Sequence, residues 1–361
     1  MARLGLGKAW RPLLVNEWDE KKISCYQGWF GQEPTLAAGD VAALTPARLP
    51  GRADLAWASF PCQDLSLAGA GAGLRGARSG TFWPFWALMR GLRREGRAPR
   101  LIVLENVRGA ITSHGGEDLA AIVRAVGKAG YVVGALVIDA VHFLPQSRPR
   151  LFIVAVDRAI PLPPALRSDA PQAPWHPASL ERVLARLTAA EREAWVWWRL
   201  PSPPPRPGQL LDLLEAHPQE TPWHGPEETA RLLALMTPVQ RAKVAAMQAA
   251  GERQAGGLFK RTRKEADGGR RQRAEVRFDG VAGCLRTPAG GSSRQTVVLV
   301  EGGEVRSRLL SPREAARLMG LPEAYPLPAS RSDAYHLTGD GVAVPVVRFL
   351  ASHLLEPLLE T

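Results

Sequence analysis

Short apolar runs alternate with helical patterns through residues 12–157, and this alternation restricts the fold more than any other feature. It is typical of βαβ units, in which parallel strands are joined by helices that cover the sheet. The expected strands are Pro12–Val15, Asp54–Ser59, Leu101–Leu104, Val132–Ile138 and Leu151–Val156. The expected helices are roughly Thr81–Glu95 and Gly116–Gly130. The sequence therefore predicts an α/β domain built on a mostly parallel sheet.

The pattern changes after Asp157. Prolines cluster in Pro161–Pro177 and in Pro201–Pro207, and the second cluster predicts a stiff extended linker. Further helices are expected over Leu180–Trp198, Glu227–Met236, Pro238–Ala250, Pro312–Met319 and Val342–Leu358. We therefore predict a first domain made of residues 1–157 and 307–361, and a smaller, irregular domain made of residues 158–306.

The charge of the chain favours a polyanionic partner. Its 361 residues include 46 basic and 35 acidic side chains, so the net charge is +11. Nucleic acid is the first candidate for a partner of such a protein. The stretch Lys260–Arg277 concentrates eight basic and three acidic residues, although a solvated loop with scattered charge is the alternative.

The three cysteines, Cys25, Cys62 and Cys284, are odd in number and far apart. This spacing argues against a disulfide framework and against a zinc site, and it favours a reducing cytoplasm. The sequence shows no signal peptide and no run of about 18 apolar residues, so we expect neither export nor a membrane span.

Cys62 follows an apolar run and Pro61, at the place where a strand of the predicted sheet ends. Open α/β sheets carry their reactive groups at the carboxyl ends of the strands. A thiol there is a candidate nucleophile, because thiolate attack is characteristic cysteine chemistry. A small buried apolar residue is the alternative.

Two further polar clusters border the expected strands. Glu105 and Asn106 end the run Leu101–Leu104, so a carboxylate is expected at the same edge of the sheet, although a helix cap is the alternative. Arg148 and Arg150 are spaced by one residue, so in an extended chain both point to the same side and can face one anion or carboxylate. Two solvent-facing charges are the alternative.

Together these residues resemble the C5-cytosine DNA methyltransferases. The run Phe60-Pro61-Cys62-Gln63 matches the Pro-Cys-Gln loop of that family, Glu105-Asn106-Val107 matches its Glu-Asn-Val motif, and Gln146 to Arg150 match Gln-x-Arg-x-Arg. Residues 308–320 and 335–345 are similar to the two motifs that follow its target-recognition region. The resemblance covers nearly the whole chain, and it implies a Rossmann-like methyltransferase domain with a smaller target-recognition domain.

The resemblance also implies a mechanism. Cys62 would add to C6 of a cytosine, Glu105 would donate a proton or hydrogen bond to N3, Arg148 would hold O2, and Arg150 would support the loop. The methyl group would come from S-adenosyl-L-methionine (SAM). The target base would have to leave the DNA stack, because this chemistry cannot occur inside a duplex.

Cofactor and DNA contacts follow from the same resemblance. Glu17 would bind the ribose hydroxyls, Trp18 would pack on the adenine, and Asp40 would bind the adenine amino group. The remaining expected cofactor residues are Val41, Pro61, Asp340 and Val342, where Asp340 replaces the usual Asn of the family. The expected DNA contacts are Gln63, Ser66, Arg75, Arg78, Gln146, Arg286, Thr287, Gly290, Gly291, Ser292 and Arg294. Cys284 is expected to be a packing residue.

The family opens with a strand and a Phe-x-Gly-x-Gly loop that wraps the methionine part of SAM. Alignment on Asn16 and Glu17 places that loop before Met1. We expect a start assigned too far downstream or a truncated chain, and weak SAM binding by the chain as it stands.

The expected partners are double-stranded DNA and a cognate restriction endonuclease, with the enzyme acting as a bacterial cytoplasmic monomer. Three alternatives remain open: a non-catalytic DNA-binding relative, a tRNA cytosine-5 methyltransferase, and an enzyme similar to thymidylate synthase. The long region 158–306 weighs against the second, and the Glu-Asn-Val motif weighs against the third. The recognition sequence cannot be predicted, because base choice depends on loop geometry.

Overall fold

The computed structural model describes residues 1–60, 82–264, 268–288 and 294–360. Its central sheet has the order β3-β4-β6-β5. These strands are β3 (Leu55–Ser59), β4 (Leu101–Val107), β5 (Tyr131–Asp139) and β6 (Pro149–Asp157). Strand β3 pairs parallel with β4, and β6 runs antiparallel to both β4 and β5. Three of the four strands therefore run in one direction, and the predicted Rossmann-like α/β class is confirmed.

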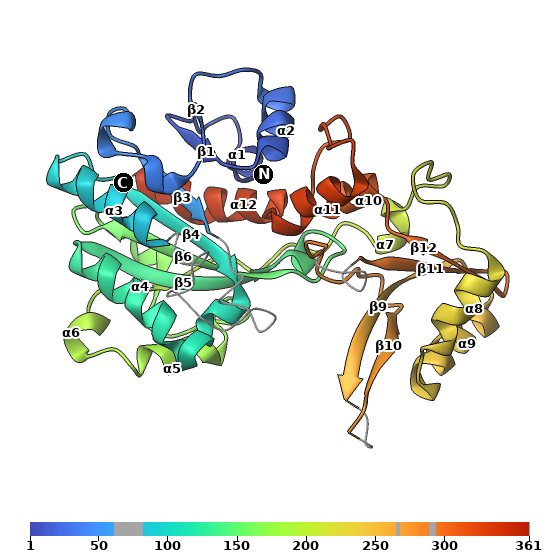
Figure 1. Ribbon diagram of the computed structural model, residues 1–361. Coiled ribbons are helices and arrows are strands. Elements are labelled where there is room, and N and C mark those ends of the chain that lie inside the picture. Colours follow the sequence, from blue (N-terminus) through green and yellow to red (C-terminus); the bar gives the residue numbers. More distant parts are fainter. Residues whose placement is uncertain (61–81, 265–267, 289–293, 361) are drawn as a thin grey trace.

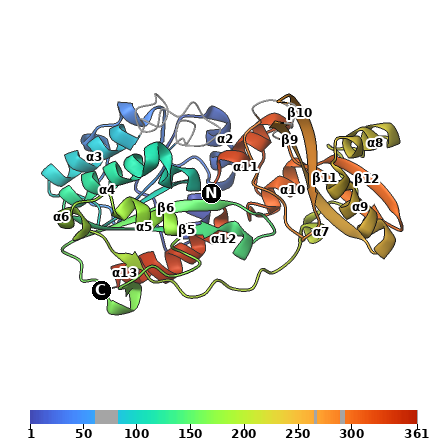
Figure 2. The same ribbon diagram turned by 90° about the horizontal axis from the view of Figure 1, so that it is seen from below.

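Both faces of this sheet are covered, which explains why β4 is a continuous apolar run. Ile102 and Leu104 pack with α3 (Phe82–Arg94) and α4 (Glu117–Lys128). Leu101 and Val103 point to the other face, where the C-terminal helices pack. Figures 1 and 2 show these helices on opposite sides of the strands. The predicted α3 and α4 are confirmed to within one or two residues at each end.

The chain ends in a long, nearly continuous helical stretch. It comprises α11 (Arg331–Asp340), α12 (Val344–Leu350), a π-helical turn (Ala351–Leu355) and α13 (Glu356–Leu359). By length and composition Arg331–Leu359 could cross a membrane, but 56% of its most apolar window is buried inside the protein. Core helices satisfy the same criteria, and residues of α11 to α13 belong to the larger apolar core.

The first forty residues form a smaller layer, drawn in blue at the top of Figure 1. It contains α1 (Ala2–Leu6), β1 (Val15–Glu17), α2 (Glu20–Phe30) and β2 (Leu36–Ala38), with β1 parallel to β2. The expected strand Pro12–Val15 is displaced, because pairing begins only at Val15. Short 3-10 turns occupy Val41–Ala43, Pro46–Arg48, Arg108–Ile111, Ser113–Gly116, Ala140–His142 and Pro164–Leu166.

A second, antiparallel sheet has the order β10-β9-β11-β12. Its strands are β9 (Gln254–Lys264), β10 (Arg270–Arg277), β11 (Thr296–Glu301) and β12 (Glu304–Leu309). Helices α8 (Pro226–Ala234) and α9 (Pro238–Ala250) cover one face, and α10 (Pro312–Arg317) follows β12. The basic stretch therefore belongs to a hairpin, and the alternative of a plain loop is wrong for its described part. Ala274 and Val276, two alternate residues of that stretch, pack with Leu258 in a third apolar cluster.

The expected helix Leu180–Trp198 is wrong. The chain forms α5 (Ala178–Leu184), α6 (Ala189–Arg192) and the strand β8 (Trp197–Trp198), which pairs with β7 (Arg167–Ser168). Helix α5 ends at Leu184, and α6 starts after Thr188, whose side chain forms a capping box with that of Glu191. A single turn, α7 (Leu210–Leu213), follows the proline-rich segment.

The predicted division into two domains stays a prediction. Part of the segment after position 157 packs on the central sheet. The indole nitrogen of Trp198, for example, donates to the carbonyl of Val154 at 3.2 Å. Trp175 and Trp198 share the larger core with the C-terminal helices. The second predicted boundary, at 306/307, lies inside β12.

Candidate active site

Glu105 lies at the end of β4, opposite Ser59 of β3 in the parallel ladder. It is only 5% exposed. Its side chain is hydrogen-bonded to that of Ser59, and its Oε1 lies 3.4 Å from Nε of Arg150. Burial raises the pKa of Glu105, although Arg150 and Ser59 act in the opposite direction. This carboxyl can therefore hold a proton at a higher pH than an exposed one.

Asn106, the next residue, fixes the chain where it leaves β3. Its side-chain amide donates to the carbonyl of Phe60 at 3.2 Å, and its own oxygen accepts from the amide of Val107 at 2.8 Å. The rings of Phe60 and Phe82 lie 5.8 Å apart between centroids. The two ends of the segment that carries Cys62 are thus anchored beside Glu105.

Arg148 is almost completely buried, with 1% of its surface exposed. Nη1 donates to the carbonyl of Leu285 at 2.8 Å, and Nη2 donates to the carbonyls of Gly339 and Gly341, each at 2.6 Å. Burial lowers the pKa of Arg148 to about 10. The side chain joins the residue before β6 to two later segments, and its Nη1 and Nη2 groups donate to the backbone rather than to a ligand.

Arg150, in contrast, faces Glu105 and Cys284. Its Nη1 and Nη2 lie 3.9 and 4.0 Å from Sγ of Cys284, and Nη1 of Arg148 approaches the same sulfur at 3.6 Å. Burial alone would raise the pKa of the Cys284 thiol, but the two guanidinium groups outweigh it and the net shift is downward. The expectation that Cys284 is a packing residue stays a prediction, and its sulfur also belongs to this charged cluster.

Gln146 is fully buried, and its amide bonds to the protein itself. Nε2 donates to the carbonyl of Leu318 at 2.6 Å, and Oε1 accepts from the amide of Leu285 at 3.2 Å. The prediction that Gln146 contacts nucleic acid is corrected for this structure. Its role is to join the loop of Arg148 to the segment that carries Cys284.

A close approach of two backbones completes this junction. A Cβ built on Gly339 would lie 2.6 Å from the amide nitrogen of Thr287 and 2.7 Å from the carbonyl carbon of Arg286. Only glycine leaves room for this crossing. The segment after Cys284 is thereby held against α11.

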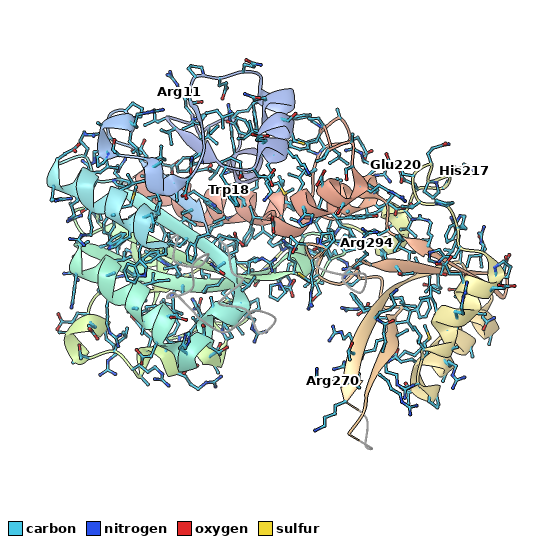
Figure 3. The ribbon with its side chains drawn as sticks, viewed as in Figure 1. Arg11, Trp18, His217, Glu220, Arg270 and Arg294 are labelled. Atoms are coloured by element: carbon cyan, nitrogen blue, oxygen red, sulfur yellow. The ribbon has the colours of Figure 1, made fainter. Side chains whose placement is uncertain are left out.

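The expected cofactor residues Glu17, Trp18 and Asp40 lie together at the ends of β1 and β2. The amide of Gly39 donates to the carbonyl of Glu17 at 2.9 Å, so the two strand ends are adjacent. The carboxylate of Glu17 accepts from the amides of Trp18 and Asp19, which orients it. Trp18 is 75% exposed, and Figure 3 labels it on this part of the molecule. An open indole beside an oriented carboxylate fits an adenosine group.

Asp40 also caps the following turn by accepting from the amide of Ala42 at 2.8 Å. Of the other expected cofactor residues, Val41 is half-buried. Asp340 forms an ion pair with Lys22 of α2 at 2.7 Å. Val342 is 5% exposed and belongs to the larger core, so its side chain packs within the protein.

Three expected DNA contacts lie in the segment that joins β10 to β11. Arg286 and Arg294 are exposed and line one shallow pocket, together with Leu310 and Tyr335. Thr287 is half-buried. Figure 3 places Arg294 between the two sheets of the molecule.

Nine expected site residues lie outside the described residues. They are Pro61, Cys62, Gln63, Ser66, Arg75, Arg78, Gly290, Gly291 and Ser292. In the part of the chain that the structure describes, no group of three or more His, Cys, Asp or Glu side chains could hold a metal ion.

Comparison with known proteins identifies the family of this chain. The profile of the C-5 cytosine-specific DNA methylase family matches residues 2–356. The chain belongs to this family. Members of the C-5 cytosine-specific DNA methylase family are DNA (cytosine-5)-methyltransferases and use SAM as the methyl donor. The family resemblance and the enzyme class expected from the motifs are confirmed.

Relatives match along most of the chain. The Type II methyltransferase M.NlaX of Neisseria lactamica is 27% identical over 362 residues, covering 98% of this chain and 92% of that protein. M.HpaII of Haemophilus parainfluenzae is 25% identical, covering 96% of this chain and 83% of that protein. The crystal structure of S. pombe Dnmt2 methyltransferase matches with a TM-score of 0.53 at 16% identity, covering 96% of this chain and 91% of that one. This last likeness concerns the fold alone.

Some residues of this methylase site were not expected from its motifs. Ser59 is opposite Glu105 because it ends the neighbouring strand, and parallel pairing alone would have indicated it. The carboxylate of Asp139 accepts from the amide of Arg148 at 2.6 Å, and no motif marks it. Cys284 is two residues from an expected DNA contact. Its partners, Arg148 and Arg150, lie at the start of β6 and cannot be found from the sequence around Cys284.

Proposed function

We propose that this methylase transfers a methyl group to C5 of a cytosine flipped out of a specific duplex DNA sequence, through a covalent adduct between Cys62 and C6. Family membership and the Type II relatives support the reaction class. The observation that carries the mechanism is the buried Glu105 beside Arg150, at the strand edge where the chain leaves for Cys62.

In this proposal the Cys62 thiolate forms a bond to C6, and the electron pair of the C5–C6 double bond becomes available at C5. Protonated Glu105 donates to N3 and offsets the charge that develops on the ring. Burial favours the protonated form of Glu105, because the charged carboxylate is poorly solvated there.

The two arginines exchange the roles that the motif implied. Arg148 already donates to three carbonyls, whereas Arg150 is held beside Glu105. We therefore assign the contact with O2 of the base to Arg150, and the support of the loop to Arg148. An oriented guanidinium there stabilises the anionic adduct.

The residues present fit the adenosine half of SAM. Glu17 would hold the ribose hydroxyls, Trp18 would pack on the adenine, and Asp40 would accept from its amino group. When bound, SAM supplies the electrophilic methyl group. After methylation a base removes the proton from C5, the electron pair re-forms the C5–C6 double bond, and the Cys62 thiolate leaves.

The finer expectations about partners belong to the same proposal. Double-stranded DNA is the substrate, residues 158–306 supply target recognition, and the enzyme works as a cytoplasmic monomer alongside a restriction endonuclease. Arg286, Thr287 and Arg294 face the DNA from the recognition side, and Gln63, Ser66, Arg75 and Arg78 from the nucleophile side. Gly290, Gly291 and Ser292 complete the expected contacts.

Two experiments test this proposal. Methylation-sensitive sequencing of DNA from cells that express the chain should show 5-methylcytosine in one sequence context, and the pattern should vanish with Cys62→Ala. In vitro, duplex DNA with 5-fluorocytosine at the target should form a complex that survives denaturation, because fluorine cannot leave C5 as a proton does. A pattern that survives Cys62→Ala would overturn the mechanism, and methyl transfer to tRNA alone would overturn the substrate.

A further inference from the structure

An ion pair between two helices lies beside the expected cofactor residues. Nζ of Lys22, in the first turn of α2, is 2.7 Å from Oδ2 of Asp340, the last residue of α11. The two helices lie side by side (Figures 1 and 2). The family usually has Asn at the position of Asp340, and an Asn side chain cannot form an ion pair. The pair is therefore a feature of this chain rather than of the family motif.

Lys22 is close to the carboxylate that is expected to hold the ribose. Burial alone would lower the pKa of Lys22, but the charge of Asp340 opposes this effect and the net shift is upward. Glu17 and Asp19 also raise the pKa through their charges. Lys22 is therefore charged, and its ammonium group lies within electrostatic reach of Glu17. The ion pair is thus next to the place where the adenosine group fits.

Both partners keep bonding capacity that the pair does not use. A lysine ammonium group has three donor hydrogens, and in the described part of the chain Lys22 donates to Asp340 alone. A carboxylate accepts through two oxygens, and Lys22 occupies Oδ2 of Asp340. The side chains of Lys22 and Asp340 are 22% and 46% exposed. Lys22 also lines an open cavity of about 400 Å³, within the usual range for small-molecule sites. A ligand can therefore bond to both side chains without breaking the pair.

The pair suits a ligand that carries a carboxylate and an ammonium group close together. An α-amino acid has both groups on one carbon atom, so it can place its carboxylate on Lys22 and its ammonium group on Asp340. Carboxylates outnumber cations around Lys22, because Glu17 and Asp19 also act on it. The amino group of Met1, near Glu17, is mostly uncharged at neutral pH, since burial lowers its pKa to about 6. Such surroundings favour a ligand with more positive than negative groups, as in a sulfonium that also carries an amino acid.

We infer that Lys22 and Asp340 bind the amino-acid end of the cofactor, Lys22 through the α-carboxylate and Asp340 through the α-ammonium group. The inference rests on the proposed function, which places the adenosine of SAM on Glu17 and Trp18. It adds Lys22 to the site as a specificity-determining residue, because an ammonium group there favours a ligand that carries an α-carboxylate. Charge-assisted hydrogen bonds of this kind are about twice as strong as neutral ones.

The experiment measures the binding of three ligands to the full chain by isothermal titration calorimetry. S-adenosyl-L-homocysteine has the complete amino-acid end, its decarboxylated counterpart lacks the α-carboxylate, and 5′-methylthioadenosine lacks both charged groups. The variants are Lys22→Gln and Asp340→Asn. The matched control is Lys21→Gln, because Lys21 also forms an ion pair of 2.7 Å with α11, through Asp333, but its side chain is 63% exposed. Thermal unfolding shows that each variant is folded.

Lys22→Gln should bind S-adenosyl-L-homocysteine about 10- to 100-fold more weakly, the range expected for one hydrogen bond between charged groups. Its affinity for the decarboxylated ligand and for 5′-methylthioadenosine should not decrease. Asp340→Asn should weaken the binding of both ligands that carry the ammonium group and should leave the binding of 5′-methylthioadenosine unchanged. Lys21→Gln should change none of the three affinities.

Four outcomes would each overturn the inference. They are wild-type affinity of Lys22→Gln or Asp340→Asn for S-adenosyl-L-homocysteine, an equal loss for 5′-methylthioadenosine, an equal loss in Lys21→Gln, and no binding of S-adenosyl-L-homocysteine to the wild-type chain. Failure of the inference is distinguishable from failure of the proposed function. Lys22-dependent binding in a chain that transfers no methyl group to DNA would refute only the proposed function. Methyl transfer to DNA by a chain whose affinity for S-adenosyl-L-homocysteine does not depend on Lys22 would refute only the inference.

Discussion

Arginine side chains have opposite roles in two regions of this methylase. Arg148 is 1% exposed, and its donors are directed at three backbone carbonyls from distant segments. The side chains of Arg261 and Arg263 are 50% and 51% exposed and share one carboxylate. A buried guanidinium among carbonyls organises the protein, whereas these exposed guanidinium groups stand in like-charged cross-strand pairs at its surface. The surroundings, and not the residue type, decide the role.

The largest expected effect concerns the buried side of this comparison. Glu105→Gln keeps the size of the side chain but cannot transfer a proton. It should lower the rate of methyl transfer by about 10²- to 10⁴-fold, the usual contribution of a positioned acid, while DNA affinity stays near the wild-type value. Single-turnover transfer of labelled methyl groups measures the rate. A rate within tenfold of wild type would remove Glu105 from the mechanism.

Glu105 should also make the stability depend on pH. Its pKa is raised in the folded protein, so the folded state binds more protons than the unfolded chain. The resulting stability is present below the ordinary carboxyl pKa and is lost as the pH rises through the raised value. The unfolding free energy of Glu105→Gln, measured by urea denaturation, should therefore increase relative to that of wild type as the pH rises. A difference independent of pH would contradict the raised pKa.

Arg148→Ala tests the organising role of a buried guanidinium. It should cost about 3 to 5 kcal/mol of unfolding free energy, because three buried carbonyls lose their donors. Arg261→Ala, the matched change at a half-exposed arginine of β9, should stay within about 0.5 kcal/mol of wild type. Chemical denaturation measures both. An equal loss of unfolding free energy in the two variants would contradict the different roles of the buried and the exposed arginines.

Cys284 should report on the charge beside the buried arginines. Its pKa is lowered by Arg148 and Arg150, whereas burial raises the pKa of Cys25, which is 4% exposed. Because the thiolate is the reactive form, iodoacetamide at neutral pH should alkylate Cys284 at least about tenfold faster than Cys25. Peptide mapping by mass spectrometry follows each site separately. Slower reaction at Cys284 would mean that the guanidinium groups do not govern its pKa.

The sequence predicted those parts of the molecule that depend on local pattern. Strand β4 and helix α4 follow from apolar periodicity, and Glu105 was placed at a strand end because its apolar run stops there. The helix over Leu180–Trp198 failed because the cap at Thr188 and the tryptophan strand override its periodicity. The cluster of Cys284 with Arg148 could not be predicted, since it joins residues 136 positions apart. Contacts of that kind arise from tertiary packing and leave no local signal.

The bonds of Arg148 also bear on how the enzyme is made. Its Nη groups donate to the carbonyls of residues 285, 339 and 341, which lie 137, 191 and 193 positions further along the chain. During synthesis the central sheet therefore emerges well before the partners of its buried cation. Until the last segment leaves the ribosome, Arg148 remains a charge at an unfinished surface, which chaperones or solvent must accommodate. The bonds that hold Arg148 are therefore complete only after residue 341 has been synthesised.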